Sequence, residues 1–238
     1  MNVLVRELSR VCQEHLLAEK WLLAPSLRVG HQWLDTVTLA AGPVLNVRIK
    51  TLKGLALDLA GPKMAESGLS LITATGSLIL VDRILHQMRS TSSGYLSSLP
   101  PSPTLSRTVY SAIDAIRLAG LNADDLQPQC FEAPEKSKDL ALILTEYLQI
   151  LGGKRLIDYA AALLIATDRL LKIPTSLSAD VIVLVPEDLD LSSMELALVK
   201  ALPTATRIDL AVDPTEEPPD ELAGDNSDAN LLRWILTP

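Results

Sequence analysis

Two acidic side chains late in the chain have types and positions that could hold a metal ion. Residues 181–185 (VIVLV) form a β-branched run typical of a buried parallel strand, and Glu187 and Asp190 follow it. Carboxylates at the carboxyl end of such a strand are good Mg²⁺ ligands. Pro186, however, occupies the first position after the run, where it can neither ligate a metal nor accept a proton. Glu187 and Asp190 remain candidates, and the alternative is that both are solvated loop residues.

A loop that could cradle phosphates is missing from the sequence. No GxxxxGK[ST] pattern occurs, and that loop would supply the backbone N–H groups and the lysine that hold a triphosphate. The nearest segment, residues 73–77 (TATGS), lacks the second glycine and the lysine, so we expect it to be the ordinary start of a helix. We therefore predict no catalytic residue and no cofactor.

The histidines and cysteines do not form a metal-binding pattern. His15, His31 and His86 are scattered without HxxH or HExxH spacing, so we predict no metal site. Cys12 and Cys130 lie far apart and neither belongs to a CxxC pair. We expect both to be buried free thiols.

A polar turn follows a short apolar run near the N-terminus. Residues 21–24 (WLLA) predict a buried strand that ends at Pro25. Ser26 is then placed to cap a helix over residues 27–39, with Arg28 in its first turn. The carboxyl end of a parallel strand is where α/β proteins place their binding groups, so this turn is a candidate site.

A second turn of the same kind follows the next predicted strand. Residues 45–51 alternate between polar and apolar side chains, as a half-buried strand does. Thr51 then opens a helix that we expect to run through Ala60 and to end at the break made by residues 61–62 (GP). Lys53 lies in the first turn of this helix and is the second basic candidate.

The order of the predicted elements indicates an α/β fold. A strand–helix–strand–helix series lies within residues 1–64, and strands and a helix return within residues 176–238. This alternation is typical of a three-layer fold in which helices cover a parallel sheet. Residues 65–175 show helical periods without a strong strand, so we predict an all-helical insertion there.

The N-terminal segment does not have the pattern of a targeting signal. Residues 2–19 have apolar side chains at helical spacing and acidic residues between them, so we predict a helix and no signal peptide. No apolar run reaches the roughly 20 residues that a membrane span needs. We expect a cytoplasmic protein with no membrane partner.

The charges are unevenly distributed along the chain. The formal net charge is −8, yet residues 1–57 carry seven Lys and Arg against four Asp and Glu. Residues 213–238 carry seven acidic residues against one arginine, Arg233, and look exposed. If any face contacts phosphates, the N-terminal third is therefore the better candidate.

Five segments, taken in order, resemble the motifs of UvrD-like superfamily I DNA helicases, and most closely the degenerate helicase-like N-terminal region of AddB-type subunits of bacterial helicase–nucleases. Each segment is weakly specific alone, but their order over about residues 20–215 carries the resemblance. The segments are residues 21–28, residues 50–56, residues 147–149 with 158–164, residues 183–190 and residues 212–216.

The resemblance implies a P-loop-NTPase-like sheet that has lost its P-loop. Residues 186–190 stand where active helicases carry the Walker B acids, and Pro186, Glu187 and Asp190 make this a degenerate Walker B. The glutamine expected after it is Leu189, and that of the next motif is Glu216. Each change removes a phosphate, Mg²⁺ or coupling contact.

The function that the resemblance implies is non-catalytic. Carried over to this sequence, Ser26, Arg28, Thr51 and Lys53 would contact single-stranded DNA. The chain would guide DNA in a complex that repairs double-strand breaks, with a helicase subunit as partner, and a second helicase-like domain and a nuclease would be expected downstream.

Two alternatives remain open at this stage. Ser26 and Thr51 could merely cap helices while Arg28 and Lys53 are solvated, in which case the chain is an interaction scaffold that docks an active helicase subunit without touching DNA. The chain could also bind ATP through an unrecognised loop.

Overall fold

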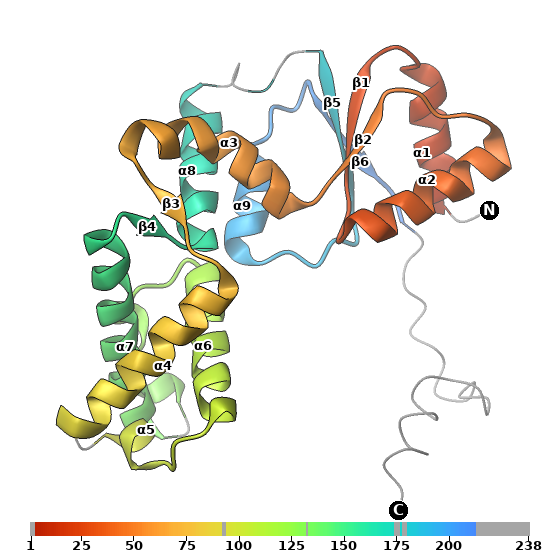
Figure 1. Cartoon of the computed structure of the whole chain (residues 1–238). Coiled ribbons are helices and arrows are strands. Elements are labelled where there is room, and N and C mark those ends of the chain that lie inside the picture. The colour runs from red at the N-terminus through yellow and green to blue at the C-terminus, as the bar shows by residue number, and fades with distance from the viewer. Residues whose placement is uncertain (1–2, 92–93, 132, 174–176, 178–179, 213–238) are drawn as a thin grey trace, which may run out of the picture.

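A four-stranded parallel sheet lies at the centre of the structure, which is a computed structural model that describes residues 3–91, 94–131, 133–173, 177 and 180–212 (Figure 1). The strand order is β2-β1-β5-β6, so the central pair joins segments from the two ends of the described chain. The strands are β1 (Glu19–Leu23), β2 (Val47–Lys50), β5 (Val181–Pro186) and β6 (Arg207–Leu210).

Helices cover both faces of this sheet. Successive side chains of a strand point to opposite faces. Leu22 and Leu184 accordingly pack against the first pair of helices, whereas Leu23, Val183 and Val185 pack against the other three. This arrangement confirms the predicted α/β class with a parallel sheet. The first pair is α1 (Val3–Glu14) and α2 (Leu27–Ala41), and the other three are α3 (Leu52–Ser67), α8 (Tyr159–Lys172) and α9 (Ser193–Ala201).

The middle of the chain forms a helical insertion with its own core, which includes the fully buried Ile84, Ile143 and Leu144. The prediction that it is all helical was wrong in one respect, because β3 (Ser70–Leu71) and β4 (Leu156–Ile157) pair in parallel where the chain leaves and re-enters the core. Its helices are α4 (Ala74–Thr91), α5 (Tyr95–Ser98), α6 (Pro103–Leu118), α7 (Pro134–Gly153) and the 3₁₀ turns η1 (Ala123–Asp125) and η2 (Pro128–Cys130).

The helix that begins at Thr51 does not end at the predicted Gly-Pro break. Pro62 lies on the exposed side of α3, and the helix continues until Gly68 adopts a left-handed φ of 62°. Met64, beyond the break, packs against the same core as Leu55, so tertiary packing outweighs the local cost of the proline. The helical insertion therefore begins later than the predicted residue 65, because α3 continues past residue 64. The helix α8 lies within the predicted range of the insertion, but it packs on the sheet.

The first helix is shorter than predicted, since α1 ends at Glu14 and Glu19 already starts β1. Lys20 is fully buried, and its Nζ donates to the carbonyl oxygens of His15 at 2.6 Å and Ala18 at 2.7 Å. Burial lowers the pKa of Lys20. Both carbonyls belong to the turn between α1 and β1, so the buried amino group fixes this turn against the sheet.

The prediction for the two cysteines was only half right. Cys12 is buried in the core between α1 and the sheet, and this burial raises the pKa of its thiol. Cys130, at the end of η2, is exposed.

A buried ion pair fixes the insertion against the α/β core. Arg117, near the end of α6, donates through Nε to Asp158 Oδ2 at 2.9 Å and through Nη2 to Oδ1 at 3.2 Å. Asp158 is also the N-cap of α8 and accepts from the backbone N–H of Ala161 at 2.8 Å. The side chains of Arg117 and Asp158 are 15% and 8% exposed, so the pair is shielded from water.

We predict that Asp158→Ala destabilises the chain by at least about 3 kcal/mol, because it leaves the guanidinium of Arg117 buried without its partner and removes a helix cap. Chemical denaturation followed by circular dichroism measures the change. Asp168→Ala is the control, because its ion pair with Lys172 is exposed and should contribute less than about 0.5 kcal/mol. Equal effects of the two variants would contradict the role of the buried pair.

We also predict that Gly30→Ala destabilises the chain by about 1–2 kcal/mol despite the higher helix propensity of alanine. A Cβ at position 30 would lie 2.4 Å from Cγ2 of Ile49 and 3.1 Å from Cβ of Ala24. The glycine therefore allows α2 to pack closely against the ends of β1 and β2. Gly152→Ala in α7 meets no atom within 4 Å and should instead stabilise by about 0.5–1 kcal/mol. Thermal melts of both variants test this contrast.

Candidate functional site

A cavity of about 470 Å³ lies where the carboxyl ends of β1, β2 and β5 meet. It is the natural candidate site, since parallel sheets bind ligands at this edge. Thr51 and Lys53 line it from the start of α3, and Asp190 lines it from the loop after β5. Its other lining residues are the largely apolar Leu23, Ala24, Pro25, Leu52, Tyr159, Leu189 and Leu191, together with the acidic Asp188 and Glu195.

The turns after β1 and β2 lie side by side, because β1 and β2 pair in parallel. The backbone N–H of Ala24 donates to the carbonyl of Lys50 at 3.0 Å, so the two strand ends are held together. Ser26 accepts from the backbone N–H of Val29 at 3.3 Å, and Thr51 accepts from that of Gly54 at 3.1 Å. Two helix N-termini therefore open at the same edge, and each is capped by a hydroxyl side chain.

The four predicted DNA-contacting residues are not equally placed. Thr51 and Lys53 line the cavity, whereas Ser26 is half-buried and Arg28 is exposed, and neither lines it. Arg28 and Lys53 make no ion pair with any described residue, although the Lys53 Nζ lies 5.5 Å from the ring centre of Tyr159. Both cations are thus available to a ligand.

The residues expected to form a degenerate Walker B do not converge. Pro186 is buried as the last residue of β5 and pairs in register with Leu210 of β6. Glu187 lines a second cavity, of about 400 Å³, beside Arg207, whereas Asp190 lines the first. Within the described part of the chain, no group of three or more His, Cys, Asp or Glu side chains is placed to hold a metal ion.

The electrostatic field around Lys53 is dominated by carboxylates. Burial raises the pKa of Asp114, on α6, and the negative charges of Asp158 and Glu195 raise it further, while Lys53 lowers it. The hydroxyl of Tyr159 donates to Glu195 Oε1 at 2.9 Å, and burial with this contact raises the pKa of the phenol far above its usual value. The β5 side of the cavity is therefore acidic.

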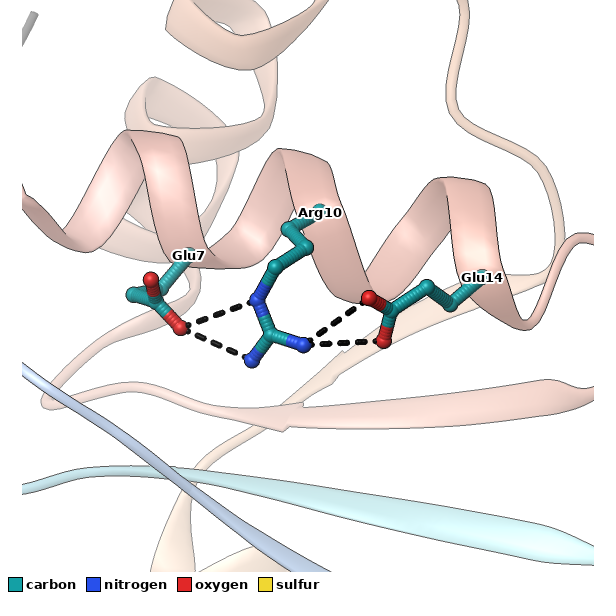
Figure 2. A network of polar contacts seen from close by, with 3 residues as sticks. All are labelled: Glu7, Arg10 and Glu14. Carbon is teal, nitrogen blue, oxygen red and sulfur yellow. Dashed lines mark hydrogen bonds and ion pairs between the residues drawn. The ribbon is translucent and has the colours of Figure 1, made fainter.

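Most of the basic residues of the N-terminal third already have partners. Arg10 lies between Glu7 and Glu14 on α1 and pairs with both (Figure 2). Its Nη2 is 2.8 Å from Glu7 Oε2, and its Nη1 is 2.9 Å from Glu14 Oε2. The positive balance of residues 1–57 is therefore not a continuous basic surface. The remaining pairs are Arg48 with Glu19 at 3.1 Å and Lys50 with Asp58, where Lys50 also lies 4.1 Å from the ring centre of Trp21.

Sequence reasoning missed several residues of this site. Asp114, Asp188 and Glu195 were not singled out as site residues, because their spacing along the chain predicts no common chemistry. Glu195 has the spacing of a capping-box partner of Ser192, and it does accept from the Ser192 backbone N–H at 3.0 Å. Residues 213–216, part of the last resembling motif, lie outside the described residues, as does the acidic segment that follows.

The comparisons with known proteins add no identification. No protein-family model matches this chain, and the curated proteins searched gave no match either. Among the described residues, no helix combines the length and apolar character that crossing a bilayer requires.

We predict that Asp114→Asn raises the melting temperature at pH 7. A raised pKa means that Asp114 binds its proton more tightly in the folded chain than in the unfolded chain, so its contribution to stability is present below the unfolded pKa of about 3.9 and is lost as the pH rises through the folded pKa. The benefit of the variant should therefore shrink as the pH falls towards 3.5. Melts of wild type and variant across this pH range measure it, with the exposed Asp168→Asn as control. A constant difference at all pH values would contradict the proposed field.

Proposed function

We propose that this chain is a non-catalytic, helicase-like module that guides single-stranded DNA within a helicase–nuclease that processes double-strand breaks. The observation that carries the proposal is the pair of helix N-termini, α2 and α3, that open side by side at the carboxyl edge of the sheet with Arg28 and Lys53 in their first turns. Such N-termini present backbone N–H groups and a partial positive charge to anions.

The charges indicate the path that a DNA strand would take. The acidic side chains Asp188, Asp190 and Glu195 gather on the β5 side of the cavity, and phosphates would be repelled there. Arg28 follows β1, lies outside the cavity and is exposed. The backbone of the strand would therefore pass over the α2 and α3 N-termini, with only Lys53 reaching it from within the cavity.

The finer fold assignment belongs to the same proposal. We interpret the sheet as a P-loop-NTPase-like core from which the phosphate loop has been lost, in a chain of the AddB type. The support is the order of the resembling segments, together with the placement of Pro186 as a buried strand end and of Glu187 and Asp190 in different cavities. These residues would then keep the backbone shape of a Walker B strand end without its ability to bind Mg²⁺.

One observation favours a second function, that of a scaffold for a helicase subunit. The cavity combines apolar walls with three acidic side chains and one lysine, and it would accept a basic side chain of a partner protein more readily than a phosphate. In this alternative the β5 side of the edge docks the partner, and DNA is not contacted.

We expect the double variant Arg28→Glu with Lys53→Glu to weaken binding of a fluorescein-labelled oligo(dT) by more than about tenfold at low salt. Losing two phosphate contacts should also lower the slope of log affinity against log salt by about 1.4, since each contact to a single strand contributes about 0.7. Fluorescence anisotropy at several salt concentrations measures both quantities.

The matched control is Lys63→Glu with Lys172→Glu, which changes the net charge equally at exposed positions of α3 and α8 away from the cavity. If the first double variant binds DNA like this control, the two turns are not the contact site. Retention of a helicase subunit without DNA would then support the scaffold function.

A further inference from the structure

A separate cavity, of about 430 Å³, lies in the helical insertion between α4 and the start of α6. None of its lining residues belongs to the cavities at the edge of the sheet. Its apolar wall is formed by Leu78, Ile79, Pro101 and Pro103. A volume of this size, with an apolar wall and a few polar groups, is typical of a small-molecule site.

Two arginines line this cavity. Arg89 donates through Nη2 to the carbonyl of Leu99 at 3.2 Å, which holds its guanidinium in place. Its Nε is buried and has no hydrogen-bond partner among the residues that the structure describes. Arg107 is exposed and makes no ion pair with the described part of the chain. The cavity thus offers the exposed guanidinium of Arg107 to a ligand, beside that of Arg89.

The cavity wall carries one acidic residue, which already accepts a hydrogen bond. Asp82 Oδ1 accepts from the Ser106 hydroxyl at 2.5 Å, and its Oδ2 lies 3.9 Å from Nε2 of His86. Arg89 and Arg107 together outweigh this one carboxylate, so the net charge of the lining is positive. The N-terminus of the 16-residue helix α6, capped by Ser102, opens at the same cavity and adds a partial positive charge.

We infer that this cavity binds a phosphate carried on an apolar ring. The phosphate would face Arg107 and the guanidinium edge of Arg89 that lines the cavity, because planar guanidinium groups bind phosphate oxygens through charge-assisted hydrogen bonds. The ring would lie against the apolar wall, where the Ile79 side chain is 63% exposed and gains contact area. Such a ligand is either a free phosphate ester or one nucleotide unit of a DNA or RNA strand.

Phenyl phosphate is the probe that tests this site, with binding measured by isothermal titration calorimetry. We expect Arg107→Gln to weaken its binding roughly tenfold, as the loss of one charge-assisted hydrogen bond predicts. Ile79→Glu should weaken it at least as much, because it places a carboxylate on the apolar wall. Both positions are exposed, so neither variant should unfold the insertion. Arg83→Gln is the control, since Arg83 is an exposed arginine of the same helix α4 that does not line the cavity.

Two further arms identify the source of the phosphate. Inorganic phosphate should bind roughly tenfold more weakly than phenyl phosphate, because it lacks the ring. If Arg107→Gln also weakens oligo(dT) binding, the site takes a nucleotide unit of a strand; if only phenyl phosphate is affected, it takes a free ester. The inference is overturned if wild type does not bind phenyl phosphate, or if Arg107→Gln and Arg83→Gln bind it equally. Neither measurement of phenyl phosphate binding depends on Arg28 or Lys53, so it tests this cavity independently of the proposed DNA contact.

Discussion

The parallel pairing of β1 with β5 is the constraint on which the rest of the structure depends. β1 lies near the N-terminus and β5 follows the whole insertion, so their ladder closes a very long loop. The entropy lost in this closure is offset by burial, because Leu22, Leu23, Val183 and Leu184 are completely inaccessible to water in the middle of the sheet. Only with this pair in place do the strand ends after Leu23, Lys50 and Pro186 face one common cavity.

That common edge is electrostatically divided, which follows from the elements that form it. The β1 and β2 ends lead into helix N-termini with the unpaired cations Arg28 and Lys53. The β5 end leads into a loop that carries Asp188 and Asp190, and then into α9 with Glu195. The acidic side chains line the cavity together with Lys53, whereas Arg28 lies outside it. A basic protein segment would therefore find favourable contacts within the cavity, and an extended anion would find them along the helix N-termini beside it. Both proposed functions therefore use the same edge in different ways.

The insertion has a hydrophobic core of its own and contacts the α/β core at a defined place. Its core is separate from those of the sheet, and the β3–β4 ladder and the Arg117–Asp158 pair connect the two parts. Asp158 takes part in both the ion pair and the cap of α8, so one side chain sets the position of α6 and the start of a core helix. A ligand in the cavity of the insertion would be carried at a fixed position relative to the sheet edge.

The sequence by itself determined the local elements and the direction of the strands. The apolar run at 181–185, the capping residues Ser26, Thr51 and Ser192, and the alternation of strands and helices depend on short-range periodicity and hydrogen bonding, so they could be predicted. The run of α3 through Pro62 could not, because a local helix breaker was outweighed by packing against α8 and the sheet.

Only the tertiary structure decided which side chains meet. Glu187 and Asp190 are close in sequence yet line different cavities, and Asp114 lies near Lys53 although β3, α4 and α5 lie between them in the chain. The physical reason is that charge interactions act across space and depend on how α6 docks on α8. That docking depends on the buried pairing of Arg117 with Asp158, two residues whose separation in the chain indicates no contact.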